Sequence, residues 1–182
     1  LARNHLGQMD LSWEDELECS AEEGAASIVP YSAHVNLYDV ELAMPSLLLG
    51  RLEIRDISRI NAYLYLGEEG LNAVFSGQGM AFDLDGDMMT ATSGGGEKVQ
   101  YRVKVLCEDT VALSPWGSST SSEASGENNK AEVKTMVLPS LPLGAKLKTA
   151  SIEGGRLRLA ISMPRWEGYL GCMDYLFSQG LF

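Results

Sequence analysis

Alternation of apolar and polar residues predicts a β-hairpin near the C-terminal end of the chain. Residues 156–163 read RLRLAISM, so every second side chain is apolar and falls on one face of a strand. Gly154 and Gly155 come directly before this segment, and glycine tolerates the positive φ angles of a two-residue hairpin loop. We therefore expect residues 145–152 to pair antiparallel with residues 156–163.

The polar face of this hairpin is basic. It carries Lys146, Lys148, Arg156 and Arg158, in a chain that has 14 lysines and arginines and a formal net charge of -11. Basic side chains on the exposed side of a strand serve solubility and discourage edge pairing, which is one interpretation. The other is a contact with the phosphate of a lipid head group, for which these four residues are the candidates.

Similar alternation predicts strands throughout the middle of the chain. These segments are residues 35–42, 52–57, 62–66, 80–92, 97–107, 110–114 and 131–138. The glycines at 94–96 indicate a second hairpin, between residues 80–92 and 97–107. One short helix is expected through residues 71–75, because Glu68 and Glu69 lie in its first turn and Gly77 suits its C-terminal end.

The N-terminal part, residues 1–29, is predicted to be an acidic arm. Residues 10–23 contain seven acidic side chains and no lysine or arginine. Like charges four residues apart, such as Glu14 and Glu18, oppose a stable helix. The arm is interpreted either as a solvated terminus or as a segment that docks on a basic partner surface.

The folded body is expected over residues 30–164, with a flexible insertion at 118–130 where no apolar periodicity remains. The segment 165–182 is rich in aromatic residues. Its candidate docking residues, which approximate one apolar face of a helix, are Trp166, Tyr169, Met173 and Phe177. Residues 165–182 are therefore either a closing helix packed on the sheet or a docking tail for a protein or a lipid interface.

Composition narrows the functional class. A chain of 182 residues with 45% hydrophobic residues fits one domain with its own core. The acidic balance argues against nucleic acid, and the longest apolar runs are too short to cross a bilayer. Three widely spaced cysteines support neither a disulfide framework nor a zinc site. The first residue is leucine rather than methionine, which we expect of a processed or truncated product.

Residues that carry catalysis are not recognisable in the sequence. No glycine loop of the phosphate-binding type occurs, and His5 and His34 have no metal-ligand spacing. Asp83, Asp85 and Asp87 resemble the start of a calcium loop, but the glycine of that motif is out of place and an acidic turn is favoured. We therefore expect a protein that is not an enzyme and has no metal or cofactor, with bound lipid as the one candidate ligand.

Two segments together resemble the LmeA-like phospholipid-binding proteins, a family of bacterial and plastid-lineage proteins. The first is residues 35–77, with a strand, a leucine-glycine turn, another strand and a short helix marked by Leu71-Asn72. The second is residues 141–164, which is similar to the family's closing pattern of proline-leucine-glycine, strand, glycine turn, leucine-rich strand and proline. Residues 150–164 alone also resemble the strand pair that closes the small heat-shock protein sandwich.

The resemblance implies an α+β fold in which a mostly antiparallel, strongly curved sheet and a few packing helices enclose an apolar groove for acyl chains. The residues expected to line that groove, which are otherwise ordinary core positions, are Leu71, Met80, Met136, Leu157, Leu159, Ile161 and Met163. The expected function is non-catalytic binding of a phospholipid or another amphiphile at a membrane surface, in a plastid at the thylakoid or in a bacterial envelope. The alternative is an accessory subunit docked on a larger membrane complex, for which a photosynthetic assembly is a candidate.

Overall fold

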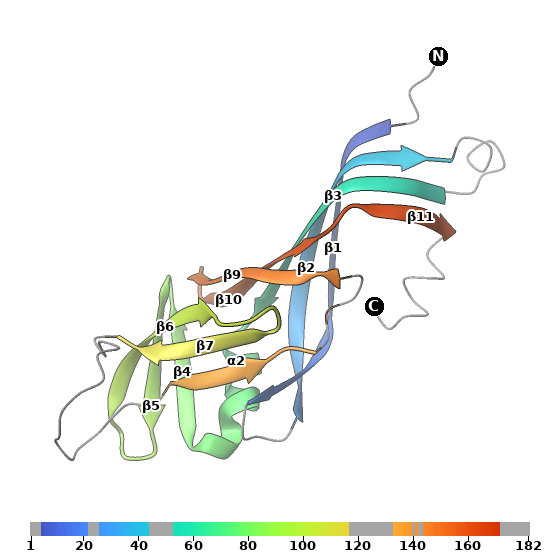
Figure 1. Cartoon of the computed structure of the whole chain (residues 1–182). Helices are drawn as coiled ribbons and strands as arrows, with labels where there is room; N and C mark the ends of the chain where they lie inside the picture. The colour runs from blue at the N-terminus through green and yellow to red at the C-terminus, as the bar shows by residue number, and fades with distance from the viewer. Residues whose placement is uncertain are drawn as a thin grey trace.

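Antiparallel pairing joins the strands into one curved sheet in the computed structural model, which describes residues 5–21, 26–43, 53–116, 133–139, 141 and 144–171 (Figure 1). The strand order is β4-β5-β6-β7-β8-β1-β2-β3-β10-β9, and β11 pairs with β3 beyond β10. The elements are β1 (His5–Ala21), β2 (Ala26–Leu42), β3 (Glu53–Leu66), α2 (Glu68–Phe75), a 3-10 turn (Ser76–Gln78), β4 (Met80–Asp85), β5 (Met88–Ser93), β6 (Lys98–Val105), β7 (Thr110–Pro115), β8 (Lys134–Val137), β9 (Lys146–Glu153), β10 (Arg156–Met163) and β11 (Trp166–Gly171).

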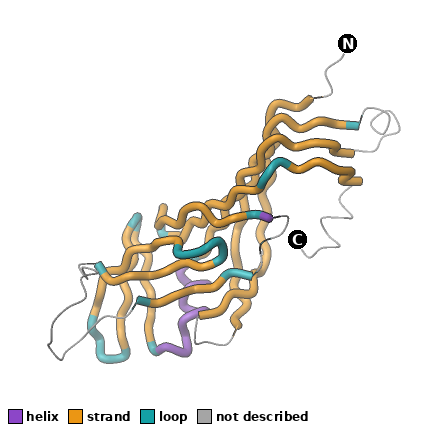
Figure 2. The backbone as a smooth tube through the Cα atoms, in the orientation of Figure 1, coloured by secondary structure: helices purple, strands orange, loops and turns teal. Residues whose placement is uncertain are grey.

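The two ends of the strand order come back together, so the sheet is nearly closed. The amide of Leu147 in β9 donates a 3.0 Å hydrogen bond to the carbonyl of Glu108, which follows β6. The amide of Gly155 donates a 2.8 Å hydrogen bond to the carbonyl of Gly86, in the turn after β4. The long strands β1, β2 and β3 form part of the barrel wall over one part of their length. Their far ends extend beyond the barrel, together with β11 (Figure 2).

The inward face of the barrel is a continuous apolar core. Its largest fully buried side chains are Phe75, Phe82, Leu66, Leu71, Met89, Leu113, Met136, Leu157, Leu159, Val29, Val40 and Val111. Most of these positions satisfy the strand or helix period of their own element, with Val29 and Val40 on β2 as the exception, so the burial of a shared face is what brings the strands together.

Helix α2 packs against β2 and β4 on the inner side of the sheet. Gly70 is buried where the helix meets β2, and a Cβ there would lie in ordinary van der Waals contact with the Cβ of Val29, at 3.4 Å. The Asn72 side chain then fixes the helix to β4: its Nδ2 donates to the carbonyl of Phe82 at 2.9 Å, and its Oδ1 accepts from the amide of Phe82 at 2.6 Å. Within the described residues, no helix is both long and apolar enough to span a bilayer.

The predicted C-terminal hairpin is confirmed. β9 and β10 pair antiparallel, with Glu153 opposite Arg156, and Gly154 and Gly155 take φ angles of 58° and 72°. The short helix is also confirmed as α2, and the antiparallel, strongly curved sheet of the expected fold class is present. The described chain contains a single α-helix, so it is mainly β rather than an α+β fold with several packing helices.

The prediction of an acidic arm over residues 1–29 is wrong for the described part of that segment. Residues 5–21 form β1, which pairs with β2 from His5 opposite Glu41 to Ser20 opposite Ala26. Helix rules do not apply to these charges, because in a strand the acidic and apolar side chains alternate between the two faces.

The prediction of a closing helix within residues 165–182 is also wrong where the structure describes the chain. Residues 166–171 form β11, an antiparallel partner of β3. Pro164 has no N–H to donate and separates β10 from β11. Arg165 then holds the new strand to β3, because its Nε and Nη2 donate to the two carboxylate oxygens of Asp56 at 3.0 and 2.9 Å.

The segment predicted as one strand over residues 80–92 is two strands, β4 and β5. A turn at Gly86, where φ is 58°, reverses the chain between Asp85 and Met88. The acidic run that resembled a calcium loop is therefore a hairpin turn, as the sequence favoured.

The backbone of β2 is irregular toward the far ends of the long strands. Leu37 pairs with Ile60 and Val40 pairs with Ile57, and all four side chains are buried. Residues three apart on a regular strand lie on opposite faces, but Asp39, between Leu37 and Val40, takes a φ of 51°. β2 therefore departs from regular strand geometry at this point, while its register with β3 stays unbroken between the two pairs.

Replacement of Asn72 by alanine is expected to destabilise the protein. The change removes two hydrogen bonds and leaves the amide and carbonyl of the buried Phe82 without partners, so the free energy of unfolding falls by about 2 kcal/mol or more. Urea unfolding followed by tryptophan fluorescence measures this. The control Lys98→Ala, at an exposed position, changes it by less than about 0.5 kcal/mol. Equal midpoints for the two variants would contradict the role of Asn72.

Burial raises the pKa of the Cys19 thiol to about 12, from an ordinary value of 9.0. Between these two values the unfolded chain releases this proton and the folded chain keeps it. Stability due to Cys19 is therefore full below pH 9 and is lost as the pH rises toward 12, by about 1.4 kcal/mol per pH unit. The difference in unfolding free energy between wild type and Cys19→Ala should shrink with this slope. A pH-independent difference would show that the thiol titrates normally.

Candidate binding surface

The outer face of the long strands carries an open hollow of about 580 Å³. It lies over β1, β2 and β3 and is bordered by the turn of the β9–β10 hairpin. Its lining residues are Ser12, Trp13, Glu14, Ser32, Ala33, His34, Tyr65, Glu153 and Arg156. Most of these residues are polar or charged, but Trp13, Ala33 and the ring of Tyr65 add apolar surface, so the lining is mixed in character.

Strand register explains why these residues meet. Glu14 lies opposite Ser32, Ser32 opposite Tyr65, and Tyr65 opposite Arg158, so one row crosses four strands. Arg158 in turn lies opposite Ser151 on β9. Side chains in such a row share one face of the sheet, and this is the face turned away from the barrel core.

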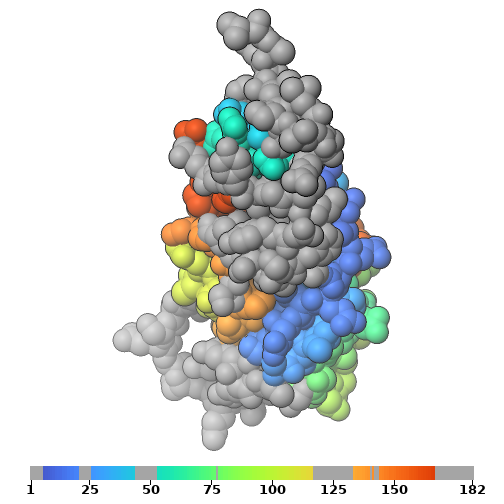
Figure 3. Space-filling model, turned by 90° about the vertical axis from the view of Figure 1, so that its right-hand side faces the viewer, coloured from blue at the N-terminus to red at the C-terminus, as the bar shows by residue number. Residues whose placement is uncertain are grey.

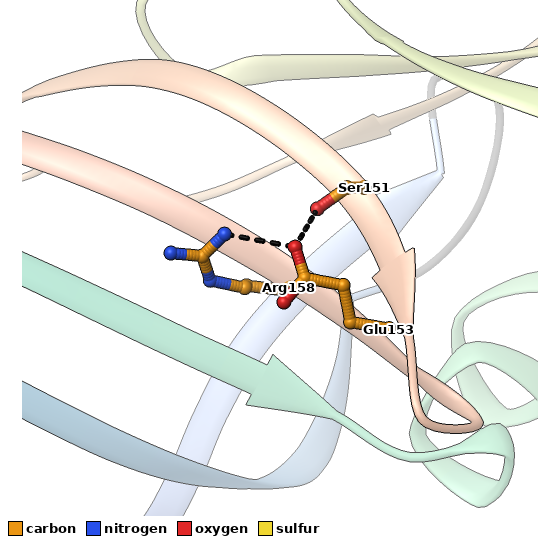
Figure 4. A network of polar contacts seen from close by, with 3 residues as sticks. All are labelled: Ser151, Glu153 and Arg158. Atoms are coloured by element: carbon orange, nitrogen blue, oxygen red, sulfur yellow. Dashed lines mark hydrogen bonds and ion pairs between the residues drawn. The ribbon is translucent and has the colours of Figure 1, made fainter. Parts of the chain in front are cut away.

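Arg158 is held by a network of polar and aromatic contacts. Its Nη1 lies 2.9 Å from Oε1 of Glu153, and Oγ of Ser151 donates to the same oxygen at 3.0 Å (Figure 4). The guanidinium also lies over the ring of Tyr63, 4.3 Å from its centroid. This arginine is therefore a structural cation whose charge is already compensated.

The pKa of Arg158 reflects these competing contacts. Burial alone lowers it, and hydrogen bonds with Glu153 and Tyr65 outweigh the burial, so the pKa lies above its ordinary value. Its Nε is buried and has no hydrogen-bond partner among the described residues. The side chain stays charged at any physiological pH.

Arg156 is the cation that remains open toward the hollow. Its Nη1 donates a 3.4 Å hydrogen bond to Oγ of Ser32. Within the described residues no carboxylate forms an ion pair with Arg156, because the salt bridge of Glu153 goes to Arg158. An exposed guanidinium beside a hydroxyl and a tyrosine can bind an anionic group or a carbonyl oxygen.

The described residues of the hollow can form hydrogen bonds and charge contacts with a ligand. No cluster of three or more His, Cys, Asp or Glu side chains suited to a metal ion occurs within the described ranges. His34 is exposed and lies opposite Ser12 and Tyr63 in the row beside Arg158.

The residues expected to line an apolar groove belong to the core. Leu71, Met136, Leu157 and Leu159 have 0% of their surface exposed, and Ile161 has 5%. Met80 and Met163 are partly buried and pack against the same cluster. An acyl chain would reach the first four residues only if the barrel opened.

The four predicted head-group residues are divided by the structure. Arg156 lines the hollow, whereas Arg158 does not line it and is paired with Glu153, which does. Lys146, the first residue of β9, forms a salt bridge with Glu108. Lys148 is exposed, at the bulge of the same strand. They do not form one basic cluster.

The predicted docking residues are only partly described. Trp166 is partly buried in β11 and lies opposite Ile57. Tyr169 belongs to the same strand, while Met173 and Phe177 lie outside the described residues.

Sequence reasoning missed Tyr63, Tyr65 and Ser32 as surface partners of the arginines, and Glu14 as a residue that lines the hollow. The two tyrosines alternate with Leu64 and Leu66, so their common face was visible in the sequence. Their meeting with β10 was not, because it depends on pairing between strands that are about ninety residues apart.

Fold and surface define this chain as a mainly β protein with a nearly closed antiparallel sheet and a polar outer hollow. Comparison of the chain with protein-family models, with curated proteins and with solved structures found no significant match.

The two arginines are expected to respond differently to truncation. Arg158→Ala removes a salt bridge and a cation–π contact and lowers the free energy of unfolding by about 1 kcal/mol. Arg156→Ala leaves it within about 0.5 kcal/mol, because this side chain makes one long hydrogen bond. Urea unfolding of both variants tests the assignment. A larger loss for Arg156→Ala would reverse the two roles.

Proposed function

We propose that this protein acts without catalysis, as an accessory subunit that docks through its outer surface on a larger protein assembly. The observation that carries the proposal is the state of the interior. The apolar faces of β10, β8 and α2 are already buried against one another, with no exposed surface at Leu71, Met136, Leu157 and Leu159. A barrel filled by its own side chains supports docking over enclosure of an acyl chain.

Exposed apolar and aromatic side chains support the same role. Ile28, Leu106 and Trp116 have 68%, 53% and 59% of their surface exposed. The guanidinium of Arg102 stacks on the Trp116 ring, 3.3 Å from its centroid. Tryptophan and arginine are the residues most enriched at the centres of protein interfaces.

A second proposal, from another class, is peripheral binding of a phospholipid or amphiphile through its head group. Arg156, open toward the hollow, and the exposed Lys148 favour it. The sequence resemblance is what supports a membrane surface as the site of either role, in a plastid at the thylakoid or in a bacterial envelope. Neither proposal includes a cofactor.

Size-exclusion chromatography of a native extract tests the accessory role. We expect the chain to elute with partner proteins, far above its own mass of 19.7 kDa. In parallel, mass spectrometry of a lipid extract from protein purified without detergent should find less than one lipid per chain.

Monomeric elution together with one tightly bound lipid per chain would refute the accessory role and favour lipid carriage. Sedimentation with phosphatidylglycerol vesicles addresses the head-group proposal. Arg156→Ala should weaken that binding and Lys104→Ala, an exposed lysine on β6, should not.

A further inference from the structure

We infer that the outer face of β5, β6 and β7 is the docking surface of this protein, and that it takes a segment of a partner in which carboxylates flank apolar side chains. This inference rests on the proposed accessory role, and it names the surface and the partner chemistry for that role.

Exposed apolar side chains gather on this face. Among the described residues, seven large apolar side chains are exposed, and four of them lie on or beside these strands: Met88, Leu106, Trp116 and Val133. Met88 and Val133 have 54% and 51% of their surface exposed. Single exposed apolar side chains are normal on a protein surface, whereas a cluster of them is typical of an interaction site.

Strand register explains why these side chains point outward together. Arg102 on β6 lies opposite Ser114 on β7. Met89 on β5 lies opposite Tyr101, so the next pair sets Met88 opposite Arg102. Met89 and Tyr101 are buried in the core, and successive side chains of a strand alternate between its two faces. Met88 and Arg102 therefore both lie on the outer face of the sheet.

Trp116 lies on the same face, beside this arginine. Its amide donates a 2.7 Å hydrogen bond to the carbonyl of Gln100, which continues the pairing of β7 with β6 by one residue. The Arg102 guanidinium lies 3.3 Å from the centroid of the Trp116 ring, and Nε2 of Gln100 donates to Sδ of Met88 at 3.9 Å. Tryptophan, arginine and methionine are the residue types that are enriched at the centres of protein interfaces.

The same face is basic along β6. Lys98, Arg102 and Lys104 occupy positions of one parity, are all exposed, and form no ion pair with a described residue. The whole chain has 25 acidic residues against 14 basic ones, so this basic strand stands out from the rest of the protein. Its three charges are available to carboxylates of a partner.

The width of the basic strip selects a narrow acidic segment over a membrane. Asp83 and Asp85 are exposed on β4, and Asp85 lies opposite Met88, so these carboxylates share the outer face. They are two strands away from the cations of β6, which is about 10 Å. A flat anionic bilayer in contact with β6 would also meet the two carboxylates, whereas a polypeptide segment lying along β6 would avoid them.

The acidic strand β1 lies elsewhere on the molecule. In the view of Figure 3, the yellow surface near the β6–β7 turn and the blue surface of β1 lie on opposite sides. Surface charges farther apart than about 10 Å are largely screened at physiological salt, so β1 does not neutralise the cations of β6. Two copies of the chain, each with a formal net charge of -11, repel each other, which favours a different protein as the occupant.

The first experiment uses the full chain and two pairs of matched variants. Trp116→Ala removes the exposed ring, and its control Leu6→Ala removes an exposed apolar side chain of β1. Arg102→Gln removes a cation stacked on an aromatic ring, and its control Arg59→Gln does the same on β3, where the guanidinium lies 4.4 Å from the centroid of Tyr38. In size-exclusion chromatography of native extracts, we expect the two face variants to elute as monomers and the two controls to elute with partner proteins.

The second experiment measures binding of a defined probe to the purified chain. The probe is a synthetic peptide that repeats two aspartates followed by two leucines, and its controls replace leucine by serine or aspartate by lysine. We expect the first peptide alone to bind, with an affinity that falls as salt is added. Trp116→Ala and Arg102→Gln should each lower the affinity by about tenfold or more, and Leu6→Ala and Arg59→Gln should leave it unchanged.

Unchanged binding of the acidic peptide by both face variants would overturn the inference. Sedimentation with phosphatidylglycerol vesicles that Trp116→Ala abolishes would overturn the partner, because the face would then contact a membrane. Self-association that Arg102→Gln abolishes would overturn it in favour of a second copy of the chain.

Failure of this inference is separable from failure of the accessory role. If the wild type and both face variants all elute with partner proteins, the chain docks by another surface and only the inference fails. If the wild type elutes alone while the acidic peptide binds through Trp116 and Arg102, the face is competent and the accessory role fails.

Discussion

The structure depends on the burial of one apolar face shared by β3 and β10. Leu66 pairs with Leu157 and Leu64 with Leu159, and three of these four side chains are fully buried. Removing such a face from water contributes about 1.5 to 3 kcal/mol for each large aliphatic side chain, and no alternative register preserves it, because a shift by one residue would turn the whole row outward. The hairpin turn places β9 beside the end of β6, where the amide of Leu147 bonds to the carbonyl of Glu108, and the sheet is nearly closed. Helix α2 covers the inner side with its buried face, Leu71, Val74 and Phe75, and Asn72 fixes it to β4 by hydrogen bonds to the backbone of Phe82.

A filled interior restricts where this protein can act. The sheet has two faces, and the side chains of the inner face are buried against one another inside the barrel. Recognition is left to the outer face and to sheet edges, where polar side chains remain hydrated and strand backbones keep unpaired groups. The outer face is divided between a compensated arginine, Arg158, and an open one, Arg156. Because Glu14 and Glu153 line the same hollow, its field is mixed, which suits a specific polar contact better than general attraction to anions.

Much of the fold was readable from local patterns, and the failures have identifiable causes. The β9–β10 hairpin follows from Gly154 and Gly155, since their φ angles are the ones that the turn requires. β1 was missed because its carboxylates were judged by helix spacing, although Leu11, Trp13, Leu17 and Cys19 all fall on odd positions. β11 was missed because the spacing of Trp166, Tyr169, Met173 and Phe177 fits a helix equally well, and pairing with Ile57 and the Arg165–Asp56 contact decide for a strand. The surface row from Glu14 to Arg158 needs four registers, and a single sequence encodes none of them explicitly.

The carboxylates of β1 are best understood as protection of a sheet edge. Among the described strands β4, β9 and β11 are likewise paired with a strand on one side only, and β1, with 17 residues, is longer than any of them. Strands of this kind are where a sheet is exposed to unwanted strand addition. Lysine or proline on such an edge would discourage pairing with any other strand. Carboxylates at Asp10, Glu14, Glu16 and Glu18 have a related effect by charge, because edge-to-edge pairing of two copies of this acidic chain would set carboxylate against carboxylate.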